Sequence, residues 1–294
     1  MASSELTSRV IASAVLVPVA LAAGYYGDAA LAALLSIAAA IAAWELYRIA
    51  RAAGVEPLAE AGIVAAALLP LVIHARYRAV FALGVSWAAV VALVIFAAAI
   101  WLRGPRRRPL AAVAVTVFGV MYTGGMLSFG YALRYHEYLV DADRSGRAAG
   151  AALLAFPLIL TWTTDTGAYF VGRAIGKRKL IPSVSPGKSV EGALGGLLLA
   201  TLAAWVYQRY VLLPTARLTL TPGWVLVFGA VVSIAAQVGD LAESLIKREA
   251  GVKDASRIIP GHGGVLDRVD SLLFVLPIAY WLLTTLPLVP VPAP

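Results

Sequence analysis

The stretch WVLVFGAVVSIAAQVGDLAESLI (Trp224–Ile246) is apolar and long enough to cross a bilayer, which takes about 20 helical residues. Its first two thirds carry no charge, whereas its end carries Asp240 and Glu243. Carboxylates at the end of a membrane span are costly to place there, and so they mark a candidate functional site. The stretch therefore predicts a membrane-spanning helix that ends in reactive groups.

The rest of the chain repeats this apolar character. Hydrophobic residues make up 61% of its 294 residues and charged residues 14%, against roughly 45–50% and about 25% in soluble domains. The apolar blocks are unbroken rather than alternating, which favours helices over a β-barrel because lipid satisfies no backbone polar groups. We expect an all-α, polytopic membrane bundle of about nine transmembrane helices, near Val10–Ala23, Ala29–Trp44, Ala61–His74, Phe81–Leu102, Leu110–Leu133, Ala149–Val171, Gly192–Leu212, Trp224–Ile246 and Leu272–Leu286.

The connections between these blocks are too short to hold a soluble domain. We therefore predict a single membrane domain over residues 1–294, with N-terminal scaffold spans in 1–148 and catalytic spans and cytoplasmic loops in 149–294. The first block could also be the apolar core of a signal peptide with Arg9 as its positive flank. The many apolar blocks that follow favour an uncleaved first span.

Basic residues divide unevenly between the two sides of the membrane in this layout. Most of the 24 lysines and arginines fall on the side of the N-terminus, and cytoplasmic loops carry an excess of Lys and Arg. We expect a multi-pass protein of the inner (cytoplasmic) cell membrane, with its N-terminus inside. The polar loops 172–191 and 247–270 then share the cytoplasmic face, where nucleotides are found.

Composition also disfavours several classes of site. The chain has no cysteine, so it forms neither a disulfide nor a thiolate metal centre. Its histidines, His74, His136 and His262, stand far apart in sequence, which disfavours a zinc enzyme. The net charge of +8 fits topology and anionic lipid head groups. No basic, aromatic-interleaved pattern predicts binding of nucleic acid.

The first polar cluster lies at the end of the eighth predicted span. Asp240, Glu243, Ser244 and Lys247 follow helical spacing and share one face of a helix, with Arg248 beside them. Two acids, a hydroxyl and a base suit a hard cation together with a phosphate. A helix end at the interface, with its ions pairing locally, accounts for the same residues equally well.

The second cluster is the loop KDASRIIPGHGGVLDRVD (253–270). Its proline and glycines make a tight backbone that can approach a ligand closely. Asp267 and Asp270 then open the last span, with Arg268 between them. The helix dipole explains one acid there, but two acids around an arginine favour a functional site. The chemistry of the loop alone leaves His262 unassigned.

The third cluster runs from a span into the loop that follows it. Asp165 shares a helix face with Tyr169 and Arg173, at i+4 and i+8. In the loop, Gly187-Lys188-Ser189 is similar to the end of a P-loop, but that motif requires glycine where Pro182 stands. We reject the P-loop. The basic residues of this loop also fit a solvated determinant of topology.

Two glycines open the seventh predicted span, Gly192 and Gly196. Small residues four positions apart let helix backbones approach closely. We expect them to mediate helix packing, within one subunit or between two.

Together the clusters gather two or three carboxylates, several basic residues and glycine-rich turns at one membrane face. Mg²⁺ usually takes one or two carboxylates plus substrate phosphates. Nucleotidyl transfer needs positioning and charge neutralisation more than a covalent protein group. This inventory predicts metal-dependent chemistry on a phosphate, with Asp240, Asp267 and Asp165 as the candidate acids.

The same residues resemble a known family. Ser244-Leu-Ile-Lys247-Arg248, then Lys253-Asp254, then PGHGGVLDRVD (260–270) is similar to the signature of phosphatidate cytidylyltransferases, also called CDP-diacylglycerol synthases. The segment from Asp165 to Gly192 resembles an upstream block of that family, with Gly187 and Ser189 as mild departures. The resemblance covers roughly residues 160–272, whereas the first four spans match only in general hydropathy.

The resemblance implies a nucleotidyltransferase that joins CTP and phosphatidic acid to give CDP-diacylglycerol and pyrophosphate in phospholipid biosynthesis. It implies an all-helical bundle, commonly a homodimer, with a polar cavity that faces the cytoplasm and opens to lipid. Asp240 and Asp267 match the metal-binding aspartates of the family, for Mg²⁺ with K⁺ as the candidate second cation.

Residue roles follow position by position. The candidates for clamping phosphate charge during catalysis are Lys188, Lys247, Arg248 and Arg268. The candidate substrate-binding residues are Asp165, Tyr169, Arg173, Ser185, Ser244, His262, Gly263, Gly264 and Asp270.

Three other functions stay open on the sequence. Two are enzymes: a CTP-using synthase for another lipid phosphate, and a CTP-dependent polyprenol kinase, which would release CDP. The third is an ion-coupled transporter, since intramembrane acids such as Asp165 and Glu45 also mark ion pathways. A transporter would spread polar residues over many spans and repeated halves, whereas here they gather at one face of the last four spans.

Overall fold

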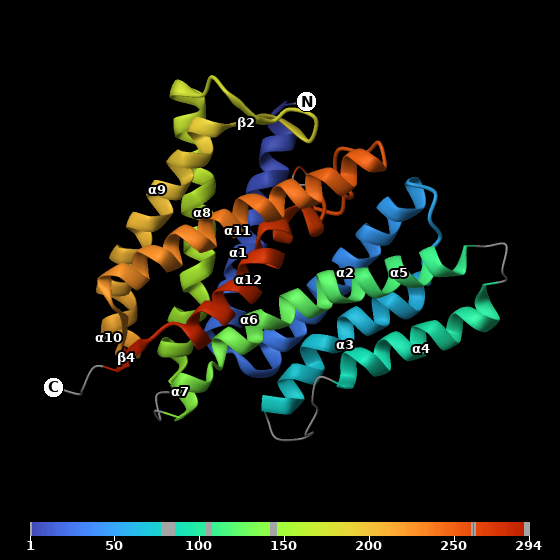
Figure 1. Cartoon of the computed structure of the whole chain (residues 1–294), viewed down its shortest axis with the longest axis horizontal. Coiled ribbons are helices and arrows are strands. Elements are labelled where there is room, and N and C mark those ends of the chain that lie inside the picture. The colour runs from blue at the N-terminus through green and yellow to red at the C-terminus, as the bar shows by residue number, and fades with distance from the viewer. Residues whose placement is uncertain are drawn as a thin grey trace. The chain divides into compact units, whose positions relative to one another are not determined.

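The computed structural model describes residues 2–77, 86–103, 108–141, 146–259, 261 and 263–290. Figure 1 follows the chain from its N-terminus in blue to its C-terminus in red. These residues are mostly helical and hold only four short strands. The all-α prediction is confirmed.

Six helices in the described part of the chain are long and apolar enough to cross a membrane. They are Asp28–Ala52, Ala59–Tyr77, Pro109–Leu139, Arg147–Ile175, Val190–Ala216 and Pro222–Glu249. Shorter apolar helices at Ala14–Tyr26 and Ala89–Leu102 overlap the first and fourth predicted spans, and the ninth predicted span lies in a helix at Leu266–Thr285. A multi-span membrane protein is confirmed, whereas the count of nine spans stays a prediction.

The chain divides into two compact units. Unit 1 comprises Met1–Tyr131 and Ile246–Val269, and unit 2 comprises Ala132–Leu245 and Asp270–Pro294. The loop 253–265 therefore packs with the N-terminal spans, although the sequence places it near the other end. The single domain with a division at residue 148 stays a prediction.

Unit 1 is built from the N-terminal helices. It contains α1 (Ala2–Tyr26), α2 (Asp28–Ala52), α3 (Ala59–Tyr77), α4 (Ser86–Leu102), α5 (Pro109–Gly119), the π-helical segment η2 (Val120–Gly125) and the start of α6 (Met126–Arg134). The end of α11 (Pro222–Glu249) and the first residues of α12 (Leu266–Thr285) complete it.

Tyr47 organises the core of unit 1. Its side chain is fully buried, and its hydroxyl donates a hydrogen bond to the backbone oxygen of Thr116 (2.8 Å). Gly62 and Gly119 flank the ring, and a Cβ at either position would overlap it. The Thr116 hydroxyl accepts the N–H of Leu58 (2.8 Å). These contacts fix α2 against α3 and α5.

Unit 2 holds the remaining elements. Its helices are the end of α6, α7 (Glu137–Asp141), α8 (Arg147–Ile175), α9 (Val190–Tyr207), the π-helical segment η3 (Gln208–Leu212), α10 (Leu213–Ala216), α11 as far as Leu245 and α12 from Asp270. Two antiparallel pairs accompany them, β1 (Lys179–Ile181) with β2 (Ser185–Ser189), and β3 (Leu218–Leu220) with β4 (Leu288–Pro290).

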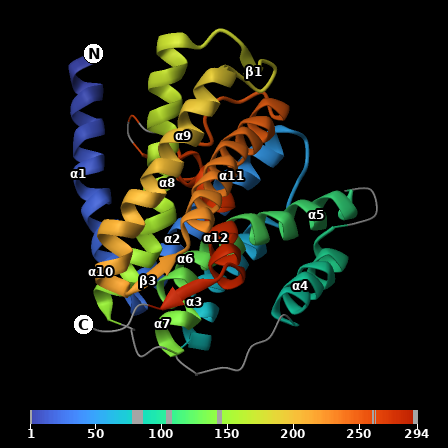
Figure 2. The ribbon, with the colours of Figure 1, turned by 60° about the vertical axis from the view of Figure 1, so that its left-hand side comes forward.

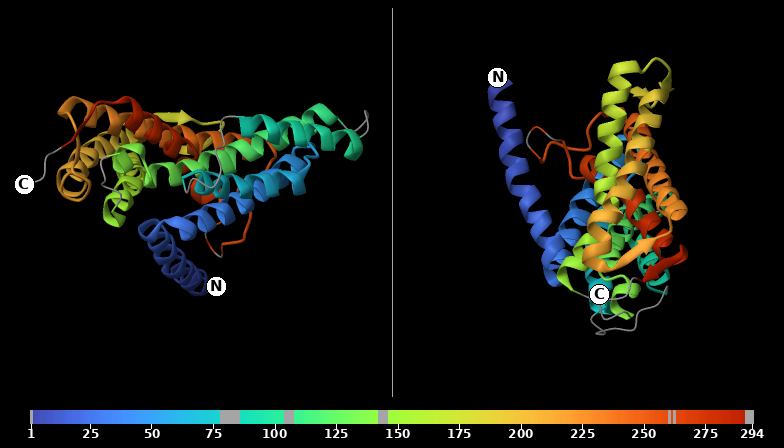
Figure 3. Two further views of the ribbon diagram at one scale, coloured as in Figure 1. Left: turned by 90° about the horizontal axis from the view of Figure 1, so that it is seen from below. Right: turned by 90° about the vertical axis from the view of Figure 1, so that its left-hand side faces the viewer.

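Helices α8 and α9 run side by side, as Figures 2 and 3 show. A Cβ on Gly192 would meet the backbone oxygen of Ala168 at 2.8 Å, and one on Gly196 would meet that of Thr164 at 2.6 Å. Both distances are shorter than a Cβ allows, so the two glycines let the backbones touch. The predicted close packing at this pair is confirmed within one chain.

An aromatic stack lies further along the contact between α8 and α9. The ring of Phe156 on α8 stacks on Tyr207 at the end of α9, with centroids 5.1 Å apart, and on Phe228 of α11, at 4.6 Å. Such pairs stabilise by about 0.5–1.5 kcal/mol beyond their buried area. The stack joins α8, α9 and α11, the three helices that carry the pocket described next.

Candidate active site

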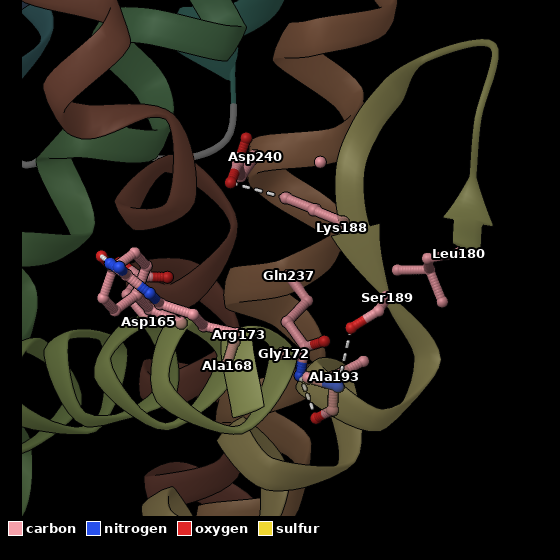
Figure 4. A pocket seen from close by; sticks show the side chains of 13 residues that line it. Asp165, Ala168, Gly172, Arg173, Leu180, Lys188, Ser189, Ala193, Gln237 and Asp240 are labelled. Carbon is pink, nitrogen blue, oxygen red and sulfur yellow. Dashed lines mark hydrogen bonds and ion pairs between the residues drawn. The ribbon is translucent and has the colours of Figure 1, made fainter. Parts of the chain in front are cut away.

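A pocket of about 490 Å³ opens in unit 2 among α8, α9, α11 and the β1–β2 hairpin. Figure 4 shows it from close by. Its lining combines acids, bases and glycines: Asp165, Ala168, Tyr169, Gly172, Arg173, Leu180, Gly187, Lys188, Ser189, Gly192, Ala193, Gln237 and Asp240. Charges of both signs in one pocket suit a ligand that carries phosphates and counterions.

Helix α8 contributes one polar face to the pocket. Asp165, Tyr169 and Arg173 all line it, as their helical spacing predicts. The guanidinium of Arg173 donates a hydrogen bond to the hydroxyl of Tyr169 (2.8 Å). The arginine is thus held at the pocket by a neighbour one turn away.

The β1–β2 hairpin brings a lysine to the same pocket. The carboxylate of Glu191 accepts the backbone N–H groups of Lys177 (3.1 Å) and Arg178 (3.2 Å), just before β1. The hydroxyl of Ser189 accepts an N–H of the first turn of α9 (3.1 Å), as an N-cap does. Lys188 therefore stands between a paired strand and a capped helix, and its backbone is fixed.

Lys188 forms an ion pair with Asp240 of α11, with Nζ and Oδ2 2.6 Å apart. Figure 4 shows the lysine reaching from the hairpin to this carboxylate. The two side chains are 28% and 34% exposed, so water and ligands reach both. The hydroxyl of Ser244 donates to the other oxygen of Asp240 at 3.4 Å. Asp165 lies close enough to interact electrostatically with Asp240 and Lys188.

The donor set fits a metal ion that is shared with a phosphate ligand. Among the described residues, no three His, Asp or Glu side chains gather to hold a metal by themselves. Mg²⁺ needs no such cage, because it usually keeps waters and binds one or two carboxylates plus substrate phosphates. Asp240 and Asp165 supply two carboxylates in one pocket, and Lys188 and Arg173 supply cations for phosphate oxygens.

A second acid and lysine pair lies in unit 1. Lys247 Nζ and Asp267 Oδ1 are 2.6 Å apart, and the side chains are only 11% and 9% exposed. The Asp267 carboxylate also accepts the backbone N–H groups of Ala255 (3.0 Å) and Gly264 (2.8 Å). Asp267 thus closes the loop 253–265 onto the start of α12. Asp240 belongs to unit 2, and the expectation that both aspartates bind metal stays a prediction.

Glu45 on α2 was named from the sequence only as an acid of a possible ion pathway, and its contacts with the loop 253–265 were not predicted. Its side chain is fully buried, and its carboxylate accepts the N–H groups of Val265 (3.0 Å) and Leu266 (2.6 Å) and the hydroxyl of Ser256. The sequence offered one signal, a lone acid inside an apolar span. Its partners lie more than 200 residues further along the chain, so no local pattern reveals them.

Other predicted residues have partners outside the pocket. Arg248 donates to the backbone oxygen of Val252 (3.3 Å) at the end of α11. Arg268 is exposed in the first turn of α12, and Asp270 accepts the N–H of Ser271 (2.6 Å). Ser185 opens β2 and is not among the residues that line the pocket. Their substrate contacts stay predictions.

The glycine turn before α12 has a defined shape. Gly263 has a φ of 81°, in the left-handed region that favours glycine. A Cβ on Gly264 would overlap the carboxylate of Glu45. His262 lies outside the described residues, and so the structure says nothing of its role.

These features define a class of protein: a polytopic helical membrane protein with a charged pocket suited to a metal-bound phosphate ligand. A model of the cytidylyltransferase family matches residues 7–286. The chain belongs to the cytidylyltransferase family, and the predicted resemblance is confirmed.

Curated relatives carry more specific names. The chain is 46% identical to the phosphatidate cytidylyltransferase of Bacillus subtilis over 134 residues, 46% of this chain and 48% of that protein. It is 40% identical to the enzyme of the same name from Haemophilus influenzae over 200 residues, 66% and 64% of the two chains. With that of Staphylococcus epidermidis it shares 46% identity over 132 residues, 45% and 49%. The chain therefore spans about half the length of two of these relatives and less than two thirds of the other.

Proposed function

We propose that this protein is a phosphatidate cytidylyltransferase, which converts CTP and phosphatidic acid into CDP-diacylglycerol and pyrophosphate. The observation that carries the proposal is the Lys188–Asp240 pair in a pocket that Asp165 also lines and that is built on membrane-spanning helices. The names of the curated relatives support the same reaction. A soluble donor and a lipid acceptor both fit a polar pocket in an apolar bundle.

The reaction is an in-line displacement at phosphorus. A phosphate oxygen of phosphatidic acid attacks the α-phosphorus of CTP and forms the new P–O bond. The bond from the α-phosphorus to the bridging oxygen breaks, and pyrophosphate leaves with that electron pair. The attacking phosphate is already anionic, so the site needs no strong general base. What it must supply is orientation and charge neutralisation.

The residues of the pocket suit these tasks. Lys188 places a partly exposed cation at the pocket, and its flexible side chain would turn from Asp240 to a phosphate oxygen. Arg173, steered by Tyr169, offers a planar donor set for a second phosphate. Gly187 also lines the pocket, and the absence of a side chain there leaves space for a triphosphate. Lys247, Arg248 and Arg268 stay candidate phosphate contacts from the sequence.

Mg²⁺ is the proposed cofactor. Asp240 would hold it in the pocket, which Asp165 also lines, and Asp267 is the second proposed ligand. When bound, it would neutralise the triphosphate and stabilise the departing pyrophosphate. K⁺ is the proposed second cation, and a homodimer is the proposed assembly.

The orientation is also a proposal. The excess of basic residues on the side of the N-terminus supports a cytoplasmic pocket, in a bacterial inner membrane. Labelling of single cysteines added to this cysteine-free chain, in loops 172–191 and 213–221, tests it. Reagents that do not cross the membrane should label the second loop in intact cells and the first only after lysis.

Product analysis tests the activity. The full chain, purified in detergent, is given CTP, Mg²⁺ and a panel of acceptors: phosphatidic acid, an ether-linked lipid phosphate and a polyprenol. We expect pyrophosphate and CDP-diacylglycerol with phosphatidic acid, and little product with the others. CDP release with a polyprenol would favour the kinase, a preference for the ether lipid would favour another synthase, and no turnover with any acceptor would contradict the proposal.

A further inference from the structure

Glu45 and Asp267 form hydrogen bonds to the same two segments of the chain, near residues 255–256 and 264–266. Glu45 binds the hydroxyl of Ser256 and the N–H groups of Val265 and Leu266. In each segment Asp267 binds the N–H group of the preceding residue, Ala255 or Gly264. All these residues belong to unit 1. The loop 253–265 is thus clamped at residues 255–256 and 264–266 by two carboxylates.

The partners of Glu45 suit a carboxylate and no other common side chain. All three groups are donors, and both carboxylate oxygens are used, one by Ser256 and Val265 and the other by Leu266. A carboxylate only accepts hydrogen bonds, whereas the amide of glutamine carries an NH₂ group. In Glu45→Gln that group would face an N–H or O–H donor, and one partner would lose its acceptor.

The turn leaves room for this acid. A Cβ at Gly264 would overlap the Glu45 carboxylate, so glycine is needed there for the carboxylate to reach the start of α12. The N–H of the same glycine donates to Asp267 (2.8 Å). If Glu45 moved, Gly264 would move with it and shift Asp267, to which its N–H donates. Lys247 would shift as well, because it is paired with Asp267 at 2.6 Å.

We propose that Glu45 is a positioning residue of the transfer reaction, which fixes the Asp267 carboxylate and the Lys247 ammonium by clamping the loop 253–265. The proposal rests on the proposed function for its activity readout. It gives the N-terminal helices a task beyond scaffolding, because α2 supplies the acid. Residues that orient functional groups in this way commonly cost about 10–100-fold in affinity or activity when mutated.

Amide-resolved hydrogen exchange tests the clamp without any substrate or metal. In Glu45→Gln we expect the N–H group that faces the amide NH₂, that of Val265 or that of Leu266, to exchange about tenfold faster, as loss of one hydrogen bond allows. If Glu45 acted only on its own partners, no other N–H group of the loop would exchange faster. Positioning predicts that the N–H groups of Ala255 and Gly264, which bind Asp267, also exchange faster. Unchanged exchange at these two would overturn the proposal.

Kinetics give the second readout. In Glu45→Gln we expect kcat to fall about 10–100-fold and the Mg²⁺ concentration for half-maximal rate to rise, while the KM for phosphatidic acid stays near that of the wild type. Ser256→Ala removes one of the three bonds and should shift both quantities less, in the same direction. Glu56→Gln is the matched control, an exposed acid of the same unit paired only at 3.6 Å with Arg51.

The outcomes separate two failures. If the wild type makes no CDP-diacylglycerol, the proposed function fails, whereas the exchange result still decides the clamp. If Glu45→Gln loses only folded protein, with wild-type kcat and Mg²⁺ dependence per folded molecule, Glu45 is structural and the positioning role is wrong. If Glu45→Gln does not fold, the same exchange and kinetic measurements are made on Ser256→Ala, which removes only one of the three hydrogen bonds.

Discussion

Two aspartate–lysine pairs of the same length lie in different surroundings. In Lys188–Asp240 and in Lys247–Asp267, the lysine Nζ lies 2.6 Å from a carboxylate oxygen of the aspartate. The first lies in a pocket with its side chains 28% and 34% exposed. The second is 11% and 9% exposed, and its carboxylate also takes two backbone N–H groups. The same two residue types therefore serve two tasks.

The difference lies in what competes for the carboxylate. Asp240 has a lysine at 2.6 Å and a serine hydroxyl at 3.4 Å as partners, so a metal cation can replace the lysine at small cost, and the lysine can then bind a phosphate. Asp267 is tied into the loop, and replacing its partners would release the backbone there. We infer that Asp240 exchanges partners during turnover, whereas Asp267 keeps its two backbone N–H partners.

The largest effect is expected for Asp267→Asn. Removing one member of a buried pair costs about 3–5 kcal/mol, and the loop loses an acceptor for two N–H groups. Both the melting temperature and the rate of CDP-diacylglycerol formation should fall. Thermal unfolding in detergent and product formation measure the two quantities on one preparation. A melting temperature equal to that of the wild type would contradict a structural task for the buried Lys247–Asp267 pair.

Asp240→Asn should affect activity alone. Exposed pairs contribute about 0–1 kcal/mol to stability, so unfolding should barely change. Loss of a metal-bound carboxylate should lower the rate at least about 100-fold, since a bound metal contributes several kcal/mol to the transition state. Pyrophosphate release reports the rate. A variant that turned over at the wild-type rate would remove Asp240 from the site.

Substitution of Lys188 should have a moderate effect. Lys188→Gln removes the cation proposed to bind a phosphate of CTP, and we expect the KM for CTP to rise about tenfold, since a charge-assisted hydrogen bond contributes about 1.5–3 kcal/mol. Lys188→Arg keeps the charge and should recover part of this loss. Steady-state kinetics at varied CTP measure both. Equal KM values for all three proteins would contradict a role in nucleotide binding.

The smallest effect is expected for Glu56→Gln. Its pair with Arg51 spans 3.6 Å at the surface, with the side chains 66% and 39% exposed. Such a pair contributes well under about 1 kcal/mol, so stability and activity should both match the wild type. A clear loss of stability or of activity in Glu56→Gln would mean that the exposed fraction of an ion pair does not predict its contribution.

Regular elements were predictable because their signals are local. The apolar blocks predicted the spans, the spacing of Asp165, Tyr169 and Arg173 predicted their shared face, and Gly192 and Gly196 predicted the tight α8–α9 contact. The four strands were missed because each has only three to five residues, too few for a periodic pattern to emerge.

The contacts that make the site were not predictable. Lys188 meets Asp240 only because a hairpin turns the chain back over the pocket, and Glu45 meets Leu266 across 221 positions of sequence. Family resemblance singled out Asp240, Asp267 and Lys188 as functional residues, but not their partners. It also gave no hint of Glu45, because the resemblance in the first four spans was limited to hydropathy.

The fate of label from CTP tests the central claim most directly. Wild type and Asp240→Asn are each given phosphatidic acid and Mg²⁺ with CTP labelled at the α- or the γ-phosphorus. We predict that wild type moves the α-label into lipid and the γ-label into pyrophosphate, in equal amounts, and that the variant moves neither. Label from the γ-phosphorus in the lipid, or equal transfer by both proteins, would contradict cytidylyl transfer at this pocket.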